Sequence, residues 1–121
     1  MIGKNLLASA ILALPAVAMA DVTLSIPLDP DGSVTTLSYS CGGGAPFAVQ
    51  YVNTGNNSLA LIEVNGARRI FVNVVAASGA RYLSGAHEWW SKGDSATLRN
   101  EMEEGSAQEC VSQPAQPAGA P

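Results

Sequence analysis

A short stretch in the second half of the chain carries the side chains best suited to recognise another molecule. Residues 76–98 read AASGARYLSGAHEWWSKGDSATL. Ser78 offers a hydroxyl and Lys92 an ammonium, and each is followed by a glycine, Gly79 or Gly93, that permits positive φ and close approach of another backbone. We predict hairpin tips that insert into another molecule. On spacing alone, two ordinary turns with a solvated lysine remain the simpler interpretation.

Residues that could carry catalysis or hold a metal are few. His87 is the single histidine, so a two-histidine metal site cannot form, and only Glu88 stands beside it. The Gly-x-Ser-x-Gly elbow of serine hydrolases does not occur. The glycine run at 42–44 lacks a following Gly-Lys-Ser/Thr, so it is not a phosphate-binding loop. We therefore expect no enzyme, no metal and no cofactor, and we expect His87 to be an exposed hairpin residue.

The elements that must position Ser78 and Lys92 are predicted to be β-strands. Apolar and polar residues alternate with a period of two, which is typical of strands with one buried face. The alternating segments are 22–28, 36–41, 47–52, 59–64 and 69–77. Asn65-Gly66 is the best tight-hairpin signal in the chain. Short strands separated by turn residues predict an all-β antiparallel sandwich or barrel.

Two further elements and the placement of the two tryptophans complete this prediction. Residues 95–105 form the one segment that could be helical, and its acidic residues are expected in a solvated loop or at a strand edge. A last short strand is expected around Cys110 and Val111. Alternation puts Trp89 and Trp90 on opposite faces, so one should lie in the core and the other should cover an end of the barrel.

The chain ends are predicted to lie outside the folded domain. Residues 1–20 combine Lys4, a short apolar run and a small-residue end, which is the pattern of a signal peptide cleaved after Ala20. The apolar run is too short to span a bilayer comfortably. Residues 21–111 are predicted to be one domain, and the Pro- and Ala-rich residues 112–121 a disordered tail.

Charge and cysteine content narrow the class of protein. The chain has 6 basic and 10 acidic residues, and loss of Lys4 with the signal peptide makes it more acidic still. This argues against nucleic acid and anionic lipid and suits a basic partner. The two cysteines, Cys41 and Cys110, are expected to form one disulfide in an oxidising compartment. The sequence does not specify an oligomeric state.

Several motifs occur together in a recognisable order. They are YSCGGGAPFAVQY from Tyr39, SGARY from Ser78, WWSKGDSATL from Trp89 and a late cysteine. This pattern resembles the periplasmic or membrane-bound inhibitors of c-type lysozyme, and it covers roughly residues 37–110. Lipid-anchored members carry a cysteine at the signal junction. This chain lacks one, so it resembles the free periplasmic kind.

The resemblance implies a fold and a binding site. The fold would be an eight-stranded antiparallel barrel tied by a disulfide, and the partner a c-type lysozyme. Ser78 would place its hydroxyl against the catalytic glutamic acid of the lysozyme, and Lys92 would reach the catalytic aspartate. Gly79, Tyr82 and Gly93 would belong to the same binding loops. Two flanking residues are expected at the rim of the interface: Arg81 and Asp94.

Two other functions stay open from the sequence. A periplasmic barrel could bind glycan or peptidoglycan through an exposed tryptophan, or the domain could be purely structural. Inhibition requires Ser78 and Lys92 at the same end of the barrel. Glycan binding requires Trp89 or Trp90 to be exposed in a groove, so the two hypotheses predict different surfaces.

Overall fold

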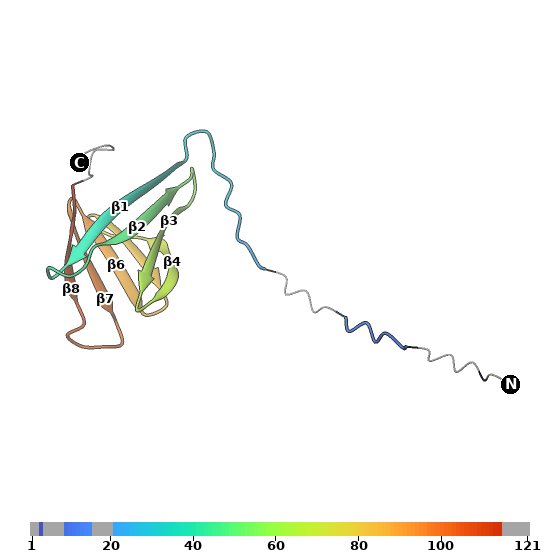
Figure 1. The fold of residues 1–121 in the computed structure, drawn as a ribbon. Helices are drawn as coiled ribbons and strands as arrows, with labels where there is room; N and C mark the ends of the chain where they lie inside the picture. The colour runs from blue at the N-terminus through green and yellow to red at the C-terminus, as the bar shows by residue number, and fades with distance from the viewer. Residues whose placement is uncertain (1–2, 4–8, 16–20, 115–121) are drawn as a thin grey trace, which may run out of the picture.

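The protein forms a closed antiparallel β-barrel in which each strand pairs with its neighbours in sequence (Figure 1). The computed structural model describes residues 3, 9–15 and 21–114. Within them the strands are β1 (Ser33–Cys41), β2 (Phe47–Asn53), β3 (Ser58–Val64), β4 (Ala67–Val74), β5 (Ala80–Ser84), β6 (His87–Lys92), β7 (Ser95–Asn100) and β8 (Gln108–Ser112). The eight-stranded barrel implied by the resemblance is confirmed.

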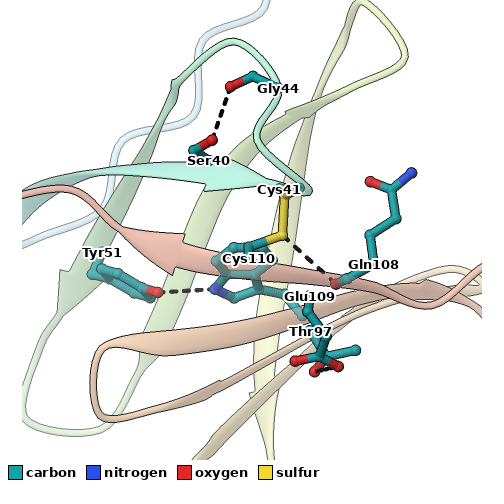
Figure 2. The surroundings of a disulfide bond; sticks show 9 residues. Ser40, Cys41, Gly44, Tyr51, Thr97, Gln108, Glu109 and Cys110 are labelled. Atoms are coloured by element: carbon teal, nitrogen blue, oxygen red, sulfur yellow. Dashed lines mark hydrogen bonds between the residues drawn. A yellow bond between two sulfur atoms is a disulfide. The ribbon is translucent and has the colours of Figure 1, made fainter.

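The barrel closes along a short seam between β1 and β8. Pairing on this seam covers only Tyr39–Cys41 of β1 against 110–112 of β8, whereas β1 pairs with β2 from Ser33 onward. Cys41 and Cys110 face each other in this register and form the predicted disulfide (Figure 2). The disulfide therefore joins the first and last strands where the barrel closes.

The alternation seen in the sequence becomes the division between barrel interior and exterior. The interior is filled by side chains from every strand, and the fully buried ones include Tyr39, Val49, Ile62, Phe71 and Trp89. Trp89 packs edge-on against Tyr39 with ring centroids 4.9 Å apart. Trp90, the next residue, points to the outer face and is half-buried. The prediction of opposite faces is confirmed.

The turns follow the predicted chemistry at Asn65-Gly66. Asn65 has φ 52° and Gly66 has φ 78°, so both central residues are left-handed, as a two-residue type I′ hairpin requires. Val64 and Ala67 pair across this turn, which sets the register of β3 against β4. The pairing then continues to Leu59 and Val72.

Two predicted elements were wrong. Residues 22–28 form no strand, and Val22 is 97% exposed. Pairing in this region begins only at Ser33, so the segment has no neighbouring strand, and Pro27 has no N–H to donate to one. The possible helix at 95–105 is also wrong: Ser95–Asn100 is β7, paired with β6 on one side and β8 on the other, and a turn follows.

Only the strands of the barrel can be compared with the predicted domain limits. The paired strands run from Ser33 to Ser112. They lie within the predicted domain except for Ser112, which was predicted to begin the tail. Most of the predicted signal peptide and residues 115–121 of the predicted tail lie outside the described residues. No helix among the described residues is both long and apolar enough to cross a membrane.

A polar chain runs through the otherwise apolar interior. The Trp89 indole N–H donates to the Tyr51 hydroxyl at 2.9 Å, and the hydroxyls of Tyr51 and Tyr39 lie 2.9 Å apart. Burial, together with the contact with Tyr51, raises the pKa of Tyr39, and burial raises that of Tyr82. Both tyrosines are therefore held neutral inside the barrel.

Alkaline pH should destabilise the fold through these tyrosines. Below the ordinary tyrosine pKa of about 10 both states are neutral, and the tyrosines contribute fully to stability. Above that pH the tyrosines of the unfolded chain ionise before those of the folded barrel, which favours unfolding. We expect the free energy of unfolding at pH 11 to fall by about 1 kcal/mol relative to pH 9 through Tyr39, and Tyr82 should change it in the same direction. Urea titrations from pH 8 to 11.5 measure this, and Tyr39→Phe should flatten the profile. A constant midpoint across this range would contradict the prediction.

Candidate functional site

The two loops singled out in the sequence lie side by side at one end of the barrel. Ser78 and Gly79 end the β4–β5 loop, and Lys92 ends β6 just before the Gly93-Asp94 turn. Ala80 pairs with Ser91 in the β5–β6 register, so Gly79 comes next to Lys92. Ser78 and Lys92 are both exposed. The structure thus places them at the same end of the barrel.

Gly79 makes this close approach possible. Its φ is 67°, and a Cβ built there would lie 2.4 Å from the Ser91 carbonyl oxygen and 2.7 Å from Cγ of Lys92. Both distances are shorter than real Cβ contacts, and the nearer atom is backbone, which cannot swing away. A side chain at position 79 would therefore push the two loops apart.

Substitution of Gly79 by alanine should cost more than the same change at Gly93. Gly93 also has a left-handed φ, 58°, but a Cβ there meets open space. We expect a loss of about 1 kcal/mol for Gly93→Ala and about 3 kcal/mol for Gly79→Ala, where steric overlap adds to the backbone strain. Urea unfolding measures both. Equal losses at the two positions would mean that the loops tolerate separation.

Trp90 connects the two loops on the outer face. Its indole N–H donates to the carbonyl oxygen of Ser78 at 2.9 Å. The ammonium of Lys92 lies 4.6 Å from the ring centroid, and Cζ of Arg81 lies 5.8 Å from it. These are cation–π distances. Lys92 and Arg81 therefore both contact the ring whose N–H holds Ser78.

An ion-pair network supports this outer face next to Trp90. Glu88, only 2% exposed, accepts from Nε of Arg81 and pairs with Nη2 of Arg99 at 3.0 Å. Glu101 pairs with both arginines, at 3.2 and 3.4 Å. The hydrogen bond to Glu88 is the main cause that raises the pKa of Arg81. The two arginines are thus balanced by two carboxylates, whereas no ion pair of the described residues includes Lys92.

The remaining predicted site residues are placed as follows. Tyr82 is 5% exposed and packs inside the barrel against Tyr51, so it underlies the loop rather than sharing the surface of Ser78. Arg81 is engaged by Glu88 and Glu101. Asp94 is exposed at the β6–β7 turn, and its backbone carbonyl accepts from the N–H of Ser112.

His87 differs from its predicted position. It was expected to be exposed, but it begins β6 at the opposite end of the barrel and is half-buried, because Asn100 of β7 and Ser84 of β5 pair with it on either side. Its Nδ1 atom is buried without a hydrogen-bond partner. Within the part of the chain that the structure describes, no group of three or more His, Cys, Asp or Glu side chains is arranged to hold a metal.

Sequence reasoning missed the contributions of Trp90 and Glu88 to this site. Alternation already placed both side chains on one face, two residues apart. Their partners Arg81 and Ser78 lie on or before β5, however, and only the β5–β6 register, in which Arg81 faces Trp90, brings them together. A hairpin signal at Ser84–Gly85 with a fixed loop length is the one feature that could have given this register.

Comparisons with known proteins assign the family. The sequence profile described as "membrane-bound lysozyme-inhibitor of c-type lysozyme" (MliC) matches residues 39–107, which include both loops. The chain belongs to the MliC family. The matched residues run from the disulfide end of β1 to the loop before β8, and the family match thus contains Ser78, Trp90 and Lys92.

Similar proteins include two curated members of the MliC family, both named membrane-bound lysozyme inhibitor of C-type lysozyme. The protein from Pseudomonas aeruginosa is 41% identical over 83 residues, covering 68% of this chain and 65% of the relative. The protein from Cupriavidus necator is 41% identical over 70 residues, covering 58% and 56%. The chain therefore spans somewhat less than two thirds of each relative. Both relatives are named inhibitors, not enzymes.

A solved structure shares the barrel. Pseudomonas aeruginosa MliC, crystallised in complex with hen egg white lysozyme, is similar with a TM-score of 0.66 and 38% sequence identity. The match covers 78% of this chain and 98% of that chain.

Proposed function

We propose that this protein inhibits c-type lysozyme by inserting its β4–β5 and β6–β7 loops into the active-site cleft. The observation that carries the proposal is the joint placement of Ser78 and Lys92 at one end of the barrel, with Lys92 in no ion pair of the described residues. The family membership and the lysozyme complex of the Pseudomonas aeruginosa relative support it.

The chemistry of the two side chains fits a lysozyme cleft. Such a cleft holds one carboxyl kept protonated and one kept ionised. The Ser78 hydroxyl can donate to or accept from the protonated carboxyl, and the Lys92 ammonium can pair with the carboxylate. Exclusion of water from the cleft strengthens that pair. The net charge of −4 would favour encounter with a basic lysozyme.

The other proposed site residues take supporting roles. Gly79 and Gly93 keep the tips small enough to enter a cleft, and Tyr82 supports the first loop from inside the barrel. Arg81 and Asp94 would lie toward the rim. The glycan-binding alternative has less support, because Trp89 is fully buried and the Trp90 ring lies under Lys92.

We place the protein in the periplasm. The pattern of residues 1–20 supports export. There it would protect the bacterial wall from lysozyme.

An enzyme assay tests the proposed function. Residues 21–121, purified in the oxidised form, are added to hen egg-white lysozyme acting on a peptidoglycan suspension. We expect dose-dependent inhibition that a cleft-binding chitotriose competes with, and weaker inhibition by Ser78→Ala. Ser84→Ala, at the far end of β5, is the matched control and should inhibit like the natural protein. No inhibition at micromolar concentrations of folded protein would refute the proposal.

A further inference from the structure

Trp90 lies where the two proposed binding loops meet and contacts both loops. Its position in strand β6 does not by itself require these contacts. A tryptophan on the outside of a small barrel needs only to cover neighbouring side chains. Here the ring and the N–H serve different partners: the N–H bonds the Ser78 carbonyl, and the ring lies next to the Lys92 ammonium. One side chain therefore contacts both residues of the proposed site, and Arg81 also lies against its ring.

The hydrogen bond fixes a loop that has few other restraints. Residues 75–79 belong to no strand, and Val75 is 94% exposed. Among the described hydrogen bonds, the one to the Ser78 carbonyl is the bond that ties this loop to the neighbouring hairpin. Close packing reinforces it, because a Cβ at Gly79 would lie 3.2 Å from the indole nitrogen. Trp90 thereby sets the position of the Ser78 backbone.

The ring fixes a side chain that would otherwise be flexible. A lysine side chain has four rotatable bonds and must lose that freedom when it enters a cleft. The ring of Trp90, 4.6 Å from the ammonium, favours one direction of the Lys92 side chain before any partner binds. Part of the cost of ordering Lys92 is therefore met in the free protein.

Charge balance around Trp90 keeps Lys92 available. Arg81 lies against the same ring, and a second free cation there would repel the ammonium. The carboxylates of Glu88 and Glu101 neutralise Arg81 and hold it on the β5 side. The uncompensated positive charge at this end of the outer face is then that of Lys92.

We propose that Trp90 is a positioning residue that couples the two loops, holding the Ser78 backbone through its N–H and the Lys92 ammonium over its ring. The consequence for inhibition rests on the function proposed above. The geometry itself does not, since it is a property of the free protein. Trp90 acts through its two partners and not by contact with lysozyme.

A double-mutant cycle tests the coupling. Trp90→Leu removes both contacts, and Trp90→Phe keeps a ring but removes the N–H. We expect the inhibition constant to rise about 30-fold for Trp90→Leu and about five-fold for Trp90→Phe. In a Lys92→Ala background, Trp90→Leu should cost no more than about five-fold, because the part of its effect that acts through Lys92 is already lost. A 30-fold effect in both backgrounds would overturn the proposal.

A measurement on the free protein separates this inference from the proposed function. In the natural protein and in Trp90→Phe, the Lys92 side-chain methylene NMR signals should be shifted upfield by the ring, and in Trp90→Leu they should return to ordinary values. Unshifted Lys92 signals in the natural protein would overturn the inference even if it inhibits lysozyme. If the natural protein does not inhibit, the proposed function fails while the shifts still decide the geometry.

Two controls distinguish the expected changes in inhibition and in the Lys92 signals from effects on folding. Ile70→Ala removes apolar surface from the outer face of β4, where Ile70 is 42% exposed and pairs with Leu61 of β3. It should change neither the inhibition constant nor the Lys92 signals. Thermal unfolding of each variant identifies any that is not folded at the assay temperature, and Trp90→Phe is retained as the test variant if Trp90→Leu is not.

Discussion

Replacement of Lys92 by alanine is expected to weaken lysozyme inhibition by about 100-fold or more while leaving the fold intact. Lys92 is exposed at the end of β6 and takes part in no ion pair of the described residues, so its removal costs the barrel little. In the proposed complex the ammonium would face a carboxylate in a cleft without water. Loss of one partner from such a desolvated pair typically costs 2–5 kcal/mol, about 30- to 5,000-fold.

Two measurements together check this result. The inhibition constant against hen egg-white lysozyme should rise, and the free energy of unfolding in urea should change by less than about 0.5 kcal/mol. Arg68→Ala is the matched control, because Arg68 is also an exposed cation but lies at the other end of the barrel, next to the β3–β4 turn. Equal inhibition by Lys92→Ala and the natural protein would remove Lys92 from the mechanism.

Loss of the disulfide should be the most damaging single change to stability. Cys41 and Cys110 are 69 residues apart, and in the chain-entropy model a closed loop of that size contributes about 4 kcal/mol. That is a large part of the 5–15 kcal/mol by which a typical domain is stable. Strand pairing at the seam covers only 39–41 of β1, and one further backbone hydrogen bond extends it at each end, from Gly42 N–H to Glu109 and from Gln113 N–H to Ser38.

Urea unfolding with and without reductant measures this contribution. The midpoint of the natural protein should fall strongly on reduction, and the double variant Cys41→Ala/Cys110→Ala should show the low midpoint in both conditions. Inhibition should persist wherever the reduced protein is still folded, because both proposed binding loops leave strands other than β1 and β8. An unchanged midpoint on adding reductant would contradict the predicted role of the disulfide.

Much of the fold could be predicted because local chemistry determines it. A period of two fixes which side chains of a strand share a face, and Asn65-Gly66 fixes a turn whose two residues must be left-handed. The predictions failed where the secondary structure of a segment depends on pairing with neighbouring strands. Residues 22–28 alternate like a strand but have no partner, and residues 95–100 are a strand because β6 and β8 pair with them on both sides.

The candidate site could be predicted less completely. Ser78 and Lys92 were recognisable as residues next to turns, and the resemblance to lysozyme inhibitors implied that they bind the same partner. Their proximity depends on the register that pairs Ala80 with Ser91, which neither composition nor spacing contains. The buried Glu88 illustrates the same limit: its burial depends on Arg81 and Arg99 from the two flanking strands.

The order of the strands has a consequence for how the chain reaches this fold. Every strand pairs with the next one in sequence, so seven of the eight interfaces are hairpins that can form locally, and only the β1–β8 seam joins distant parts of the chain. In the reduced chain, where no disulfide links β1 to β8, closing that seam carries the largest loop entropy in the molecule and should come last. Both proposed binding loops lie within hairpins, so a curled, still open sheet would already carry them. When the reduced chain refolds, the inhibitory geometry should thus form before the barrel closes.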